Sequence, residues 1–329
     1  SVWRYSLDAQ YELPWRTVAS IGYSGNRGRN FVRIEPIHIT RPGEPAGTNN
    51  FGAVYFAVPD VKSDYNALIT SLRTRFYKGL SLSANYTFGK SLDTVSWEAP
   101  CACTNQTFPV DQSEEYGRSD FDTRHHFTFS AVWDIPFYQK QDSWKSKVLG
   151  GWQVSSIVTY NTGYPWTPRT GSCLQGATAL SSNFCDPRPI AFDGTNRLGN
   201  SDEDFLSGGP FPGSFIGGNC SVAPGCNSVF TTSFPFNANP LNFPPGVGRN
   251  SFFGPKYFST DLSLGKRFGL WSESSGLDIK VNFFNVFNQL NFAPFGANSN
   301  PTHVDRVQFG IPTAGLAGRT TEIQARFSF

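Results

Sequence analysis

The chain of 329 residues can hold one large all-β domain or two ordinary domains, and its net charge of +2 gives no reason to expect a nucleic-acid partner. Phe (31 residues), Gly (32) and Pro (23) are abundant whereas charged residues make up only 16%, a composition that suits many strands joined by irregular loops. No apolar run reaches the ~18 residues that a membrane helix needs. This excludes a helical membrane protein but leaves a transmembrane barrel, because barrel strands alternate apolar and polar residues.

Nine segments of the chain show such an alternation. The first, residues 2–13, places Trp3, Tyr5 and Leu7 on one face and Arg4 and Ser6 on the other. A period of two predicts a β-strand with one apolar and one polar face. The other predicted strands span residues 17–24, 65–77, 80–88, 126–134, 152–160, 257–268, 277–283 and 319–329.

The connections between these strands alternate in length. Four are long, namely residues 25–63, 89–122, 163–256 and 289–318, and the others are shorter. Outer-membrane barrels have short periplasmic turns, long extracellular loops and aromatic residues at the membrane interfaces. The aromatic residues beside the shorter connections are Trp15, Tyr77, Trp133, Trp152 and Trp271. We therefore predict an all-β fold, an antiparallel transmembrane β-barrel segment with extracellular long loops; a soluble two-sheet domain has no reason to separate loop lengths in this way.

The last segment, RTTEIQARFSF, ends the chain on an amphipathic strand with an aromatic carboxy-terminus. Phe327 and Phe329 are predicted to act as an assembly signal for the barrel-assembly machinery. Nine strands would leave the first and last strands parallel, whereas bacterial single-chain barrels have even strand numbers and lipid tolerates no open edge. We therefore expect residues 1–329 to be the carboxy-terminal part of a larger barrel, surrounded by outer-membrane lipid.

Several stretches resemble the TonB-dependent outer-membrane receptors, specifically their Oar-like branch. They are NALITSLRTRFYKGLSLSANYTFGKSLD (66–93), SDFDTRHHFTFSAVWDIPF (119–137), GGWQVSSIVTYNTGYPWTP (150–168) and FFNVFNQLNF (283–292). The resemblance implies a 22-stranded barrel with an amino-terminal plug in the outer membrane of a Gram-negative bacterium. It also implies energy from the TonB complex, through a motif near the amino-terminus. Neither plug nor motif is in this sequence, so we expect TonB to act through a part that precedes it.

All six cysteines fall in the predicted long loops. An even number of cysteines in extracellular loops of an exported protein predicts disulfides. The nearest pairs are Cys173 with Cys185 and Cys220 with Cys226, and Cys101 with Cys103 would close a tight ring. A metal site built on the last pair is the alternative.

A polar cluster lies where the predicted strand at 126–134 leaves the long loop before it. It contains Asp120, Asp122, Arg124, His125 and His126, and a carboxylate near His at a barrel rim is typical of acid–base catalysis. Because neighbouring strand residues point to opposite faces, the two histidines cannot share one site. We therefore predict polar pairing at the rim and no catalytic residue.

Oxygen-bearing side chains also gather in the longest loop. Asp193, Asp202 and Asp204 are candidate calcium ligands, but their spacing does not match an EF-hand and such residues are common loop formers. No cofactor is therefore expected.

Charged residues occupy the predicted lumen face of several strands. The cations are Arg73, Arg75, Arg267, Lys280 and Arg326, and the anions are Asp134, Asp261, Asp278 and Glu322. They are expected to pair across neighbouring strands or to meet a plug.

These observations favour a non-enzymatic receptor and transporter barrel. Its loops would bind an extracellular ligand, whose identity the sequence does not encode, and its lumen would supply the passage. The alternative is a surface adhesion protein that binds partners through disulfide-stapled loops without transport. A hydrolase at the rim is a third hypothesis.

Overall fold

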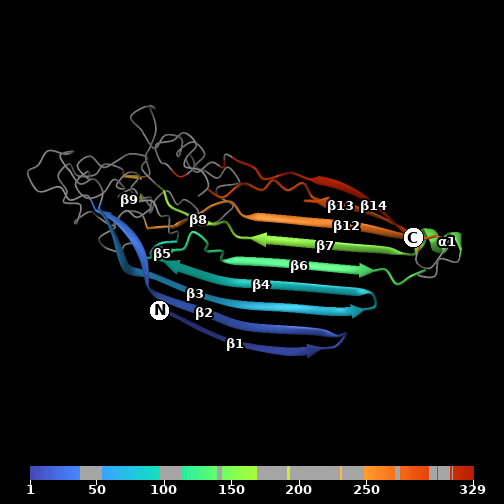
Figure 1. Cartoon of the computed structure of the whole chain (residues 1–329), viewed down its shortest axis with the longest axis horizontal. Helices are drawn as coiled ribbons and strands as arrows, with labels where there is room; N and C mark the ends of the chain where they lie inside the picture. The colour runs from blue at the N-terminus through green and yellow to red at the C-terminus, as the bar shows by residue number, and fades with distance from the viewer. Residues whose placement is uncertain are drawn as a thin grey trace, which may run out of the picture.

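The computed structural model describes residues 1–37, 54–96, 113, 115–138, 143–168, 191–192, 230–231, 248–270, 275–295, 302, 312 and 314–329. Its main element is one sheet of ten strands, nine of which follow one another from edge to edge (Figure 1). In sheet order these nine are β1 (Val2–Leu13), β2 (Thr17–Ile37), β3 (Val54–Tyr77), β4 (Leu80–Asp93), β6 (His125–Asp134), β7 (Trp152–Asn161), β12 (Tyr257–Gly269), β13 (Gly276–Phe284) and β14 (Thr320–Ser328). The two-residue strand β5 (Gly117–Arg118) pairs with the end of β4.

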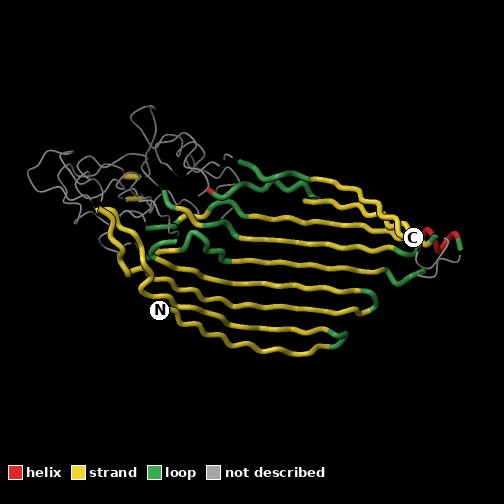
Figure 2. The backbone as a smooth tube through the Cα atoms, viewed as in Figure 1, coloured by secondary structure: helices red, strands yellow, loops and turns green. Residues whose placement is uncertain are grey.

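Every pair in this sheet is antiparallel, and each long strand lies beside the next long strand in the sequence (Figure 2). The predicted nine strands are thus confirmed. In the described part of the chain β1 and β14 are the two edges of the sheet and do not pair with each other. Two small pairs lie outside the sheet, β8 (Pro165–Trp166) with β11 (Phe252–Phe253) and β9 (Ala191–Phe192) with β10 (Phe230–Thr231).

The register keeps one face of the sheet apolar and the other polar. One row across β3, β4, β6, β7 and β12 consists of Leu72, Ala84, Phe129, Val158 and Thr260. The adjacent row, on the opposite face of the same strands, consists of Ser71, Asn85, Thr128, Thr159 and Ser259. Because the side-chain period is two, a slip of one residue in any pair would exchange the two faces.

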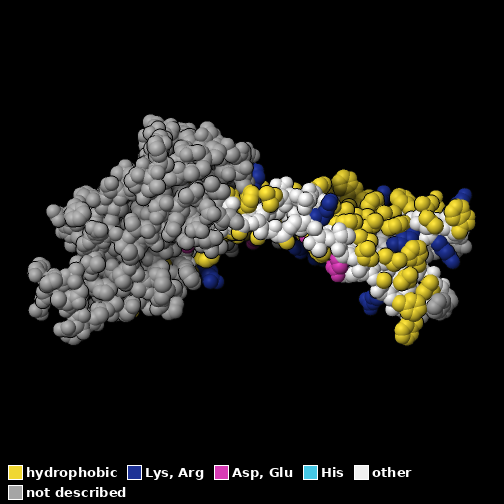
Figure 3. Space-filling model, turned by 90° about the horizontal axis from the view of Figure 1, so that it is seen from above, with side chains coloured by type: hydrophobic (Ala, Val, Ile, Leu, Met, Phe, Trp, Pro, Cys, Tyr) yellow, Lys and Arg dark blue, Asp and Glu magenta, His cyan; other side chains and the backbone are white. Residues whose placement is uncertain are grey.

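The apolar face has no second layer over it in the described residues. Large hydrophobic side chains on it are exposed, for example Leu7 at 78% and Ile323 at 73%. The buried hydrophobic residues are few, and Trp166, Phe252 and Phe295 of that group lie beyond the main strands. In the view of Figure 3, hydrophobic side chains gather at the end of the sheet away from the undescribed segments. A two-sheet soluble core is therefore excluded for these strands, whose apolar face is built to meet lipid.

The prediction of a loop at residues 25–63 is wrong, because most of this segment continues strands β2 and β3. At ~3.3 Å per residue, the 24 residues of β3 extend about 80 Å, far more than an apolar band of ~25 Å requires. The glycines of this segment make room for rings: a Cβ atom on Gly25 would lie 2.5 Å from the Tyr5 ring. Beyond Gly28 the ladder shifts register twice, at Phe31 and Arg33. Gly25 and Gly28 thus belong to long strands that leave the membrane, not to a turn.

The connection after β6 contains a helix that the sequence analysis did not predict. Helix α1 (Trp144–Leu149) begins with a capping box, in which the Ser143 hydroxyl accepts from the Ser146 N–H and the Ser146 hydroxyl accepts from the Ser143 N–H. Among the described residues, no helix has the length and apolar character needed to cross a membrane.

Aromatic residues surround the short turns, as predicted. The rings of Trp15 and Tyr77 lie 6.5 Å apart, and the Lys266 ammonium lies 4.8 Å from the centre of the Trp152 ring. Trp133, next to the last residue of β6, lies opposite Leu80, which in turn lies opposite Tyr77. The fifth predicted member, Trp271, lies outside the described residues. Because outer-membrane barrels have their short turns on the periplasmic side, we expect this girdle to mark the periplasmic interface, and the end of the sheet that carries it is called the periplasmic end below.

The two faces differ in their tolerance of charge. Replacing Phe129 with Arg places a cation at the middle of the apolar face, and we expect it to destabilise the folded protein in lipid vesicles by about 2–4 kcal/mol. The neighbouring change Ser130→Arg, on the polar face, is the matched control and should cost less than about 1 kcal/mol. Denaturant titration of the two variants in vesicles measures the difference. Equal losses in the two variants would contradict the assignment of faces.

Candidate functional site

Within the residues that the structure describes, the candidate functional site has two parts, one at each end of the sheet. The end that carries the long loops is called the extracellular end: there β5 pairs with the end of β4, and β8, which lies beyond the end of β7 in Figure 1, pairs with β11. At the periplasmic end a polar hollow lies on the inner face of β1, β2 and β3.

Arg249 ties the extracellular segments together. Its side chain is only 8% exposed, and it forms an ion pair with Asp93 that is equally buried. It also donates to the Glu115 carbonyl at 2.9 Å and to the Ser96 hydroxyl at 3.2 Å. A single guanidinium therefore joins three segments that are far apart in the sequence, and its several donors in a fixed plane suit this role.

Asn250, the next residue, connects to Thr167 and makes a second contact with the segment of Glu115, at Arg118. Its backbone N–H donates to the Thr167 hydroxyl at 2.8 Å, and that hydroxyl donates back to the Asn250 side-chain oxygen at 2.8 Å. The Asn250 amide group also donates to the Arg118 carbonyl at 2.8 Å. Asn250 has φ of 53°, a left-handed conformation that Asn adopts more readily than most residues. Arg249 and Asn250 together are called the clasp below.

An aromatic cluster and a buried carboxylate surround the clasp. The Trp166 ring lies 5.5 Å from that of Phe252 and 5.2 Å from that of Phe295. Asp122, with a side chain 1% exposed, accepts from the Ser91 N–H at 2.7 Å and pairs with Arg118 at 3.2 Å. These contacts connect the loop bases to one another in the part of the chain that the structure describes.

The β2–β3 hairpin is tied to the segment before β5 in a similar way. Asp64 accepts from Arg27 at 3.0 Å, from Arg29 at 2.9 Å and from the Tyr116 hydroxyl at 2.8 Å. Burial, followed by the hydrogen bond to Asp64, raises the pKa of Tyr116 to about 12. The phenol therefore remains a donor throughout the physiological pH range.

The rim cluster predicted from the sequence forms hydrogen bonds on two different faces. His125 lies opposite Phe88 and its Nδ1 atom is 2.8 Å from the Tyr86 hydroxyl, on the apolar side. His126 lies opposite Thr87 and contacts the Asn161 side chain, on the polar side. The predicted separation of the two imidazoles is confirmed. Asp120 and Asp122 belong to the clasp region, where they accept hydrogen bonds from Asn250 and Arg118 respectively.

The charged residues predicted on the lumen face do lie there, but few of them pair. Arg267 and Asp278 are cross-strand partners 4.0 Å apart, and Arg326 lies opposite Asp278 in the ladder. The other three carboxylates accept hydrogen bonds: Asp134 from Gln153, Asp261 from the Asn285 N–H and Glu322 from Gln324. In the described residues, neither Arg73 nor Arg75 forms an ion pair with a carboxylate.

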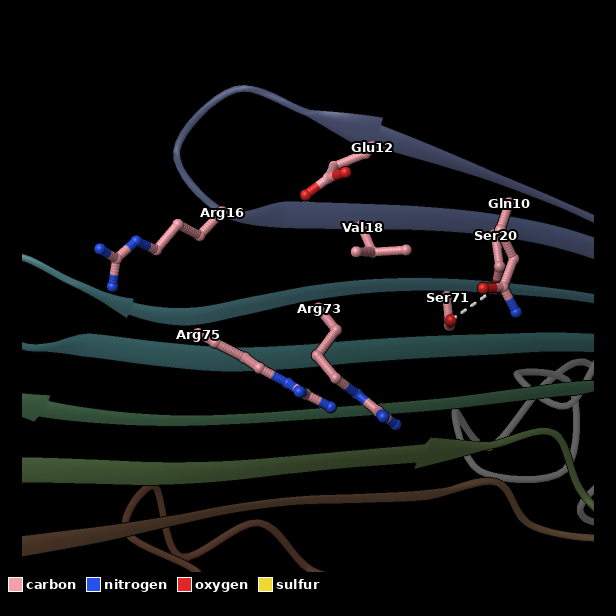
Figure 4. Close-up of a pocket in the computed structure, with 8 residues that line it drawn as sticks. All are labelled: Gln10, Glu12, Arg16, Val18, Ser20, Ser71, Arg73 and Arg75. Atoms are coloured by element: carbon pink, nitrogen blue, oxygen red, sulfur yellow. Dashed lines mark hydrogen bonds between the residues drawn. The ribbon is translucent and has the colours of Figure 1, made fainter.

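Arg73 and Arg75 instead line the hollow at the periplasmic end, together with Arg16 (Figure 4). The hollow has a volume of about 700 Å³, and its other lining residues are Gln10, Glu12, Val18, Ser20 and Ser71. The Ser20 and Ser71 hydroxyls are 2.7 Å apart, and the Arg75 N–H donates to the Arg16 carbonyl at 3.3 Å. Sequence reasoning missed Arg16, which it left in a turn.

Several predicted features lie outside the described residues. They are all six cysteines (Cys101, Cys103, Cys173, Cys185, Cys220 and Cys226) and the candidate calcium ligands Asp193, Asp202 and Asp204. Within the described ranges, no group of three or more His, Cys, Asp or Glu side chains could hold a metal ion.

The family described as "Outer membrane beta barrel domain" matches residues 1–324. Because this match covers nearly the whole chain, the chain belongs to that family, and it lies in the outer membrane of a Gram-negative bacterium. Its sheet is therefore the wall of a transmembrane barrel, with the apolar face toward lipid and the polar face toward the lumen. The class of protein predicted from the sequence is confirmed.

The solved structures that this chain matches include outer-membrane transporters and receptors. The transporter YddB from Escherichia coli is 8% identical with a TM-score of 0.48, and matches 99% of this chain and 32% of its own. The siderophore receptor PiuA from Acinetobacter baumannii is 10% identical with a TM-score of 0.47, and matches 100% of this chain and 28% of its own. The ferripyoverdine receptor of Pseudomonas aeruginosa is 10% identical with a TM-score of 0.43, and matches 100% of this chain and 27% of its own. The chain thus spans about a third of the length of these proteins or less, and no curated protein sequence matches it.

The clasp is expected to stabilise the extracellular end. Arg249→Gln leaves the buried Asp93 carboxylate without its cation, and removing one partner of a buried pair costs about 3–5 kcal/mol. Hydrogen exchange of residues 91–96 and 115–122 should therefore accelerate by roughly two orders of magnitude, the equivalent of ~3 kcal/mol. The control Arg267→Gln breaks an exposed pair at 4.0 Å and should change exchange little. Unchanged exchange in Arg249→Gln would show that the clasp does not hold the loops.

Proposed function

We propose that the chain forms part of a TonB-dependent outer-membrane receptor that binds a ligand at the cell surface and takes it up through the barrel lumen. The observation that carries this proposal is the polar face that continues across the nine strands, opposite a lipid-facing apolar face. A membrane barrel whose inner wall is hydrogen-bonding and charged can hold water and polar solutes. The proposal also includes energy from the TonB complex, which would act through a part of the protein outside this chain.

The extracellular end supports a role in ligand capture. Binding residues are commonly placed on loops that a rigid scaffold positions, and the clasp supplies such a scaffold at the base of the long loops. Disulfides between the cysteines of these loops, as predicted from the sequence, are part of the proposal, and no calcium ion or other cofactor is included in it. The ligand itself is unknown.

No chemical step is included in the proposal. His125 and His126 lie on opposite sides of the barrel wall and bond to different partners, which supports a structural role for both. The adhesion alternative has no specific support among the described residues. Phe327 and Phe329, whose rings stack at 6.0 Å, keep the predicted role of an assembly signal.

Uptake can be tested without knowing the ligand. Cells that lack the gene for this protein and cells that lack TonB should leave the same solute in a defined growth medium, whereas wild-type cells deplete it. Mass spectrometry of the spent medium measures the depletion. Arg249→Gln should reduce uptake because it removes the contacts that connect the loop bases, and Arg267→Gln serves as its control. If depletion continues unchanged without TonB, the proposed energy source is wrong.

A further inference from the structure

Helix α1 is held on the lipid-facing side of the sheet by two side chains of the neighbouring strands. Trp152 shares the apolar face of β7 with Val158, and Lys266 lies opposite Trp152 on β12. The Trp152 indole donates to the Val148 carbonyl at 3.0 Å. The Lys266 ammonium donates to the same carbonyl at 2.7 Å and also to the Gly150 carbonyl. The last turn of the helix therefore lies outside the barrel wall and not in its lumen.

The level of these contacts is that of a membrane interface. Lys266 is only 6% exposed, and its ammonium lies 4.8 Å from the centre of the Trp152 ring and 5.2 Å from that of Phe268. A cation on the lipid-facing side is costly in the middle of a bilayer, but the cost falls steeply toward the interface. Trp152 also belongs to the aromatic girdle, which is typical of the same level. Both observations favour a position of α1 beside the lipid headgroups.

The helix exposes its large apolar side chains. Trp144, Val148 and Leu149 are 73%, 56% and 51% exposed, and Ser146 is the buried residue of the helix. Trp144 and Val148 are four residues apart and therefore share one face of the helix. Because Val148 is bonded to the girdle residue Trp152, this apolar surface continues the lipid-facing side of the wall. In Figure 1 the helix lies beyond the strand ends, at the end of the sheet away from the undescribed segments.

Basic residues flank this apolar surface. Lys145 and Lys147 are exposed, and the Lys145 ammonium lies 5.8 Å from the centre of the Trp144 ring. The connection of residues 135–151 contains three lysines and one aspartate, an excess of two positive charges. Long lysine side chains can place their apolar stems beside acyl chains while the ammonium groups reach phosphate. Exposed Trp and aliphatic residues with lysines beside them are typical of a helix that lies in a membrane interface.

We propose that helix α1 is a membrane anchor outside the barrel, which lies on the periplasmic leaflet and binds anionic phospholipids. Trp144, Val148 and Leu149 enter the boundary between headgroups and acyl chains, and Lys145 and Lys147 bind lipid phosphates. The anchor ties the connection between β6 and β7 to the bilayer. It goes beyond the proposed uptake function and does not rest on it, because a barrel that transports nothing can carry the same anchor.

The position of the helix can be measured on the complete protein, purified from outer membranes and reconstituted in vesicles of phosphatidylcholine and phosphatidylglycerol. An environment-sensitive fluorescent amino acid replaces Val148, and doxyl groups on the lipid acyl chains quench its emission on contact. Doxyl groups near the headgroup should quench it strongly, and those at the far end of the acyl chain should quench it weakly. The same label should be quenched at Leu264 on the apolar face and unquenched at Ser71 on the polar face.

The role of the two lysines is tested with the label kept at Val148. Doxyl-labelled phosphatidylglycerol should quench it roughly twice as strongly as doxyl-labelled phosphatidylcholine, and the two lipids should quench equally in K145Q/K147Q. The control K280Q/R326Q removes two cations from the polar face and should keep the preference. An unquenched label would show that the helix contacts water or a periplasmic protein instead of lipid. That result, or equal quenching by the two lipids before any lysine is replaced, would overturn the proposal.

Discussion

Every feature of the described sheet depends on the pairing of backbone amides and carbonyls between neighbouring strands. Lipid offers no hydrogen bonds, so each N–H and C=O in the membrane must find its partner on the next strand. Once the ladder is formed, the period of two fixes which side chains meet lipid. The row from Leu72 to Thr260 and the adjacent row from Ser71 to Ser259 show that the register holds across five strands without a slip.

The two ends of the sheet use different means to complete this ladder. At the periplasmic end, hairpins such as Lys78–Gly79 reverse the chain in two residues and aromatic rings pack beside them. At the extracellular end β2 and β3 continue past the membrane, and the clasp residues Arg249 and Asn250 bind the segments that leave it. The first arrangement places aromatic rings where a membrane interface is expected, and the second connects the bases of the long loops to one another.

The sequence predicted the membrane strands well because lipid imposes the alternation on which the prediction relies. Predicted strand 152–160 is β7 (Trp152–Asn161), and predicted strand 257–268 is β12 (Tyr257–Gly269). The prediction failed where lipid no longer acts. Beyond the membrane neither face of β2 and β3 contacts lipid, so the alternation is lost there. Gly25 and Gly28 were therefore assigned to a loop, although both are strand residues that leave room for an aromatic side chain beside the paired strands.

The site was less predictable than the fold, because its contacts are distant in sequence. Arg249 joins Asp93 across 156 positions and lay inside a predicted loop, where no local pattern distinguishes it. Arg73 and Arg75 were placed correctly on the lumen face. That they have no carboxylate partner among the described residues could be learned only from the register of the three strands around the hollow. His125 and His126 could be separated from the sequence, because strand geometry alone puts neighbours on opposite faces.

The most direct test of a single lipid-facing side is photo-crosslinking in intact outer membranes. A photoreactive phenylalanine analogue is placed in turn at Leu72 and Ile323 on the apolar face, and at Ser71 and Gln324 on the polar face. Lipid adducts, detected by mass spectrometry, should form at the first two positions and be absent at the other two. Lipid adducts at Ser71 and Gln324, or equal labelling of both faces, would contradict the membrane barrel.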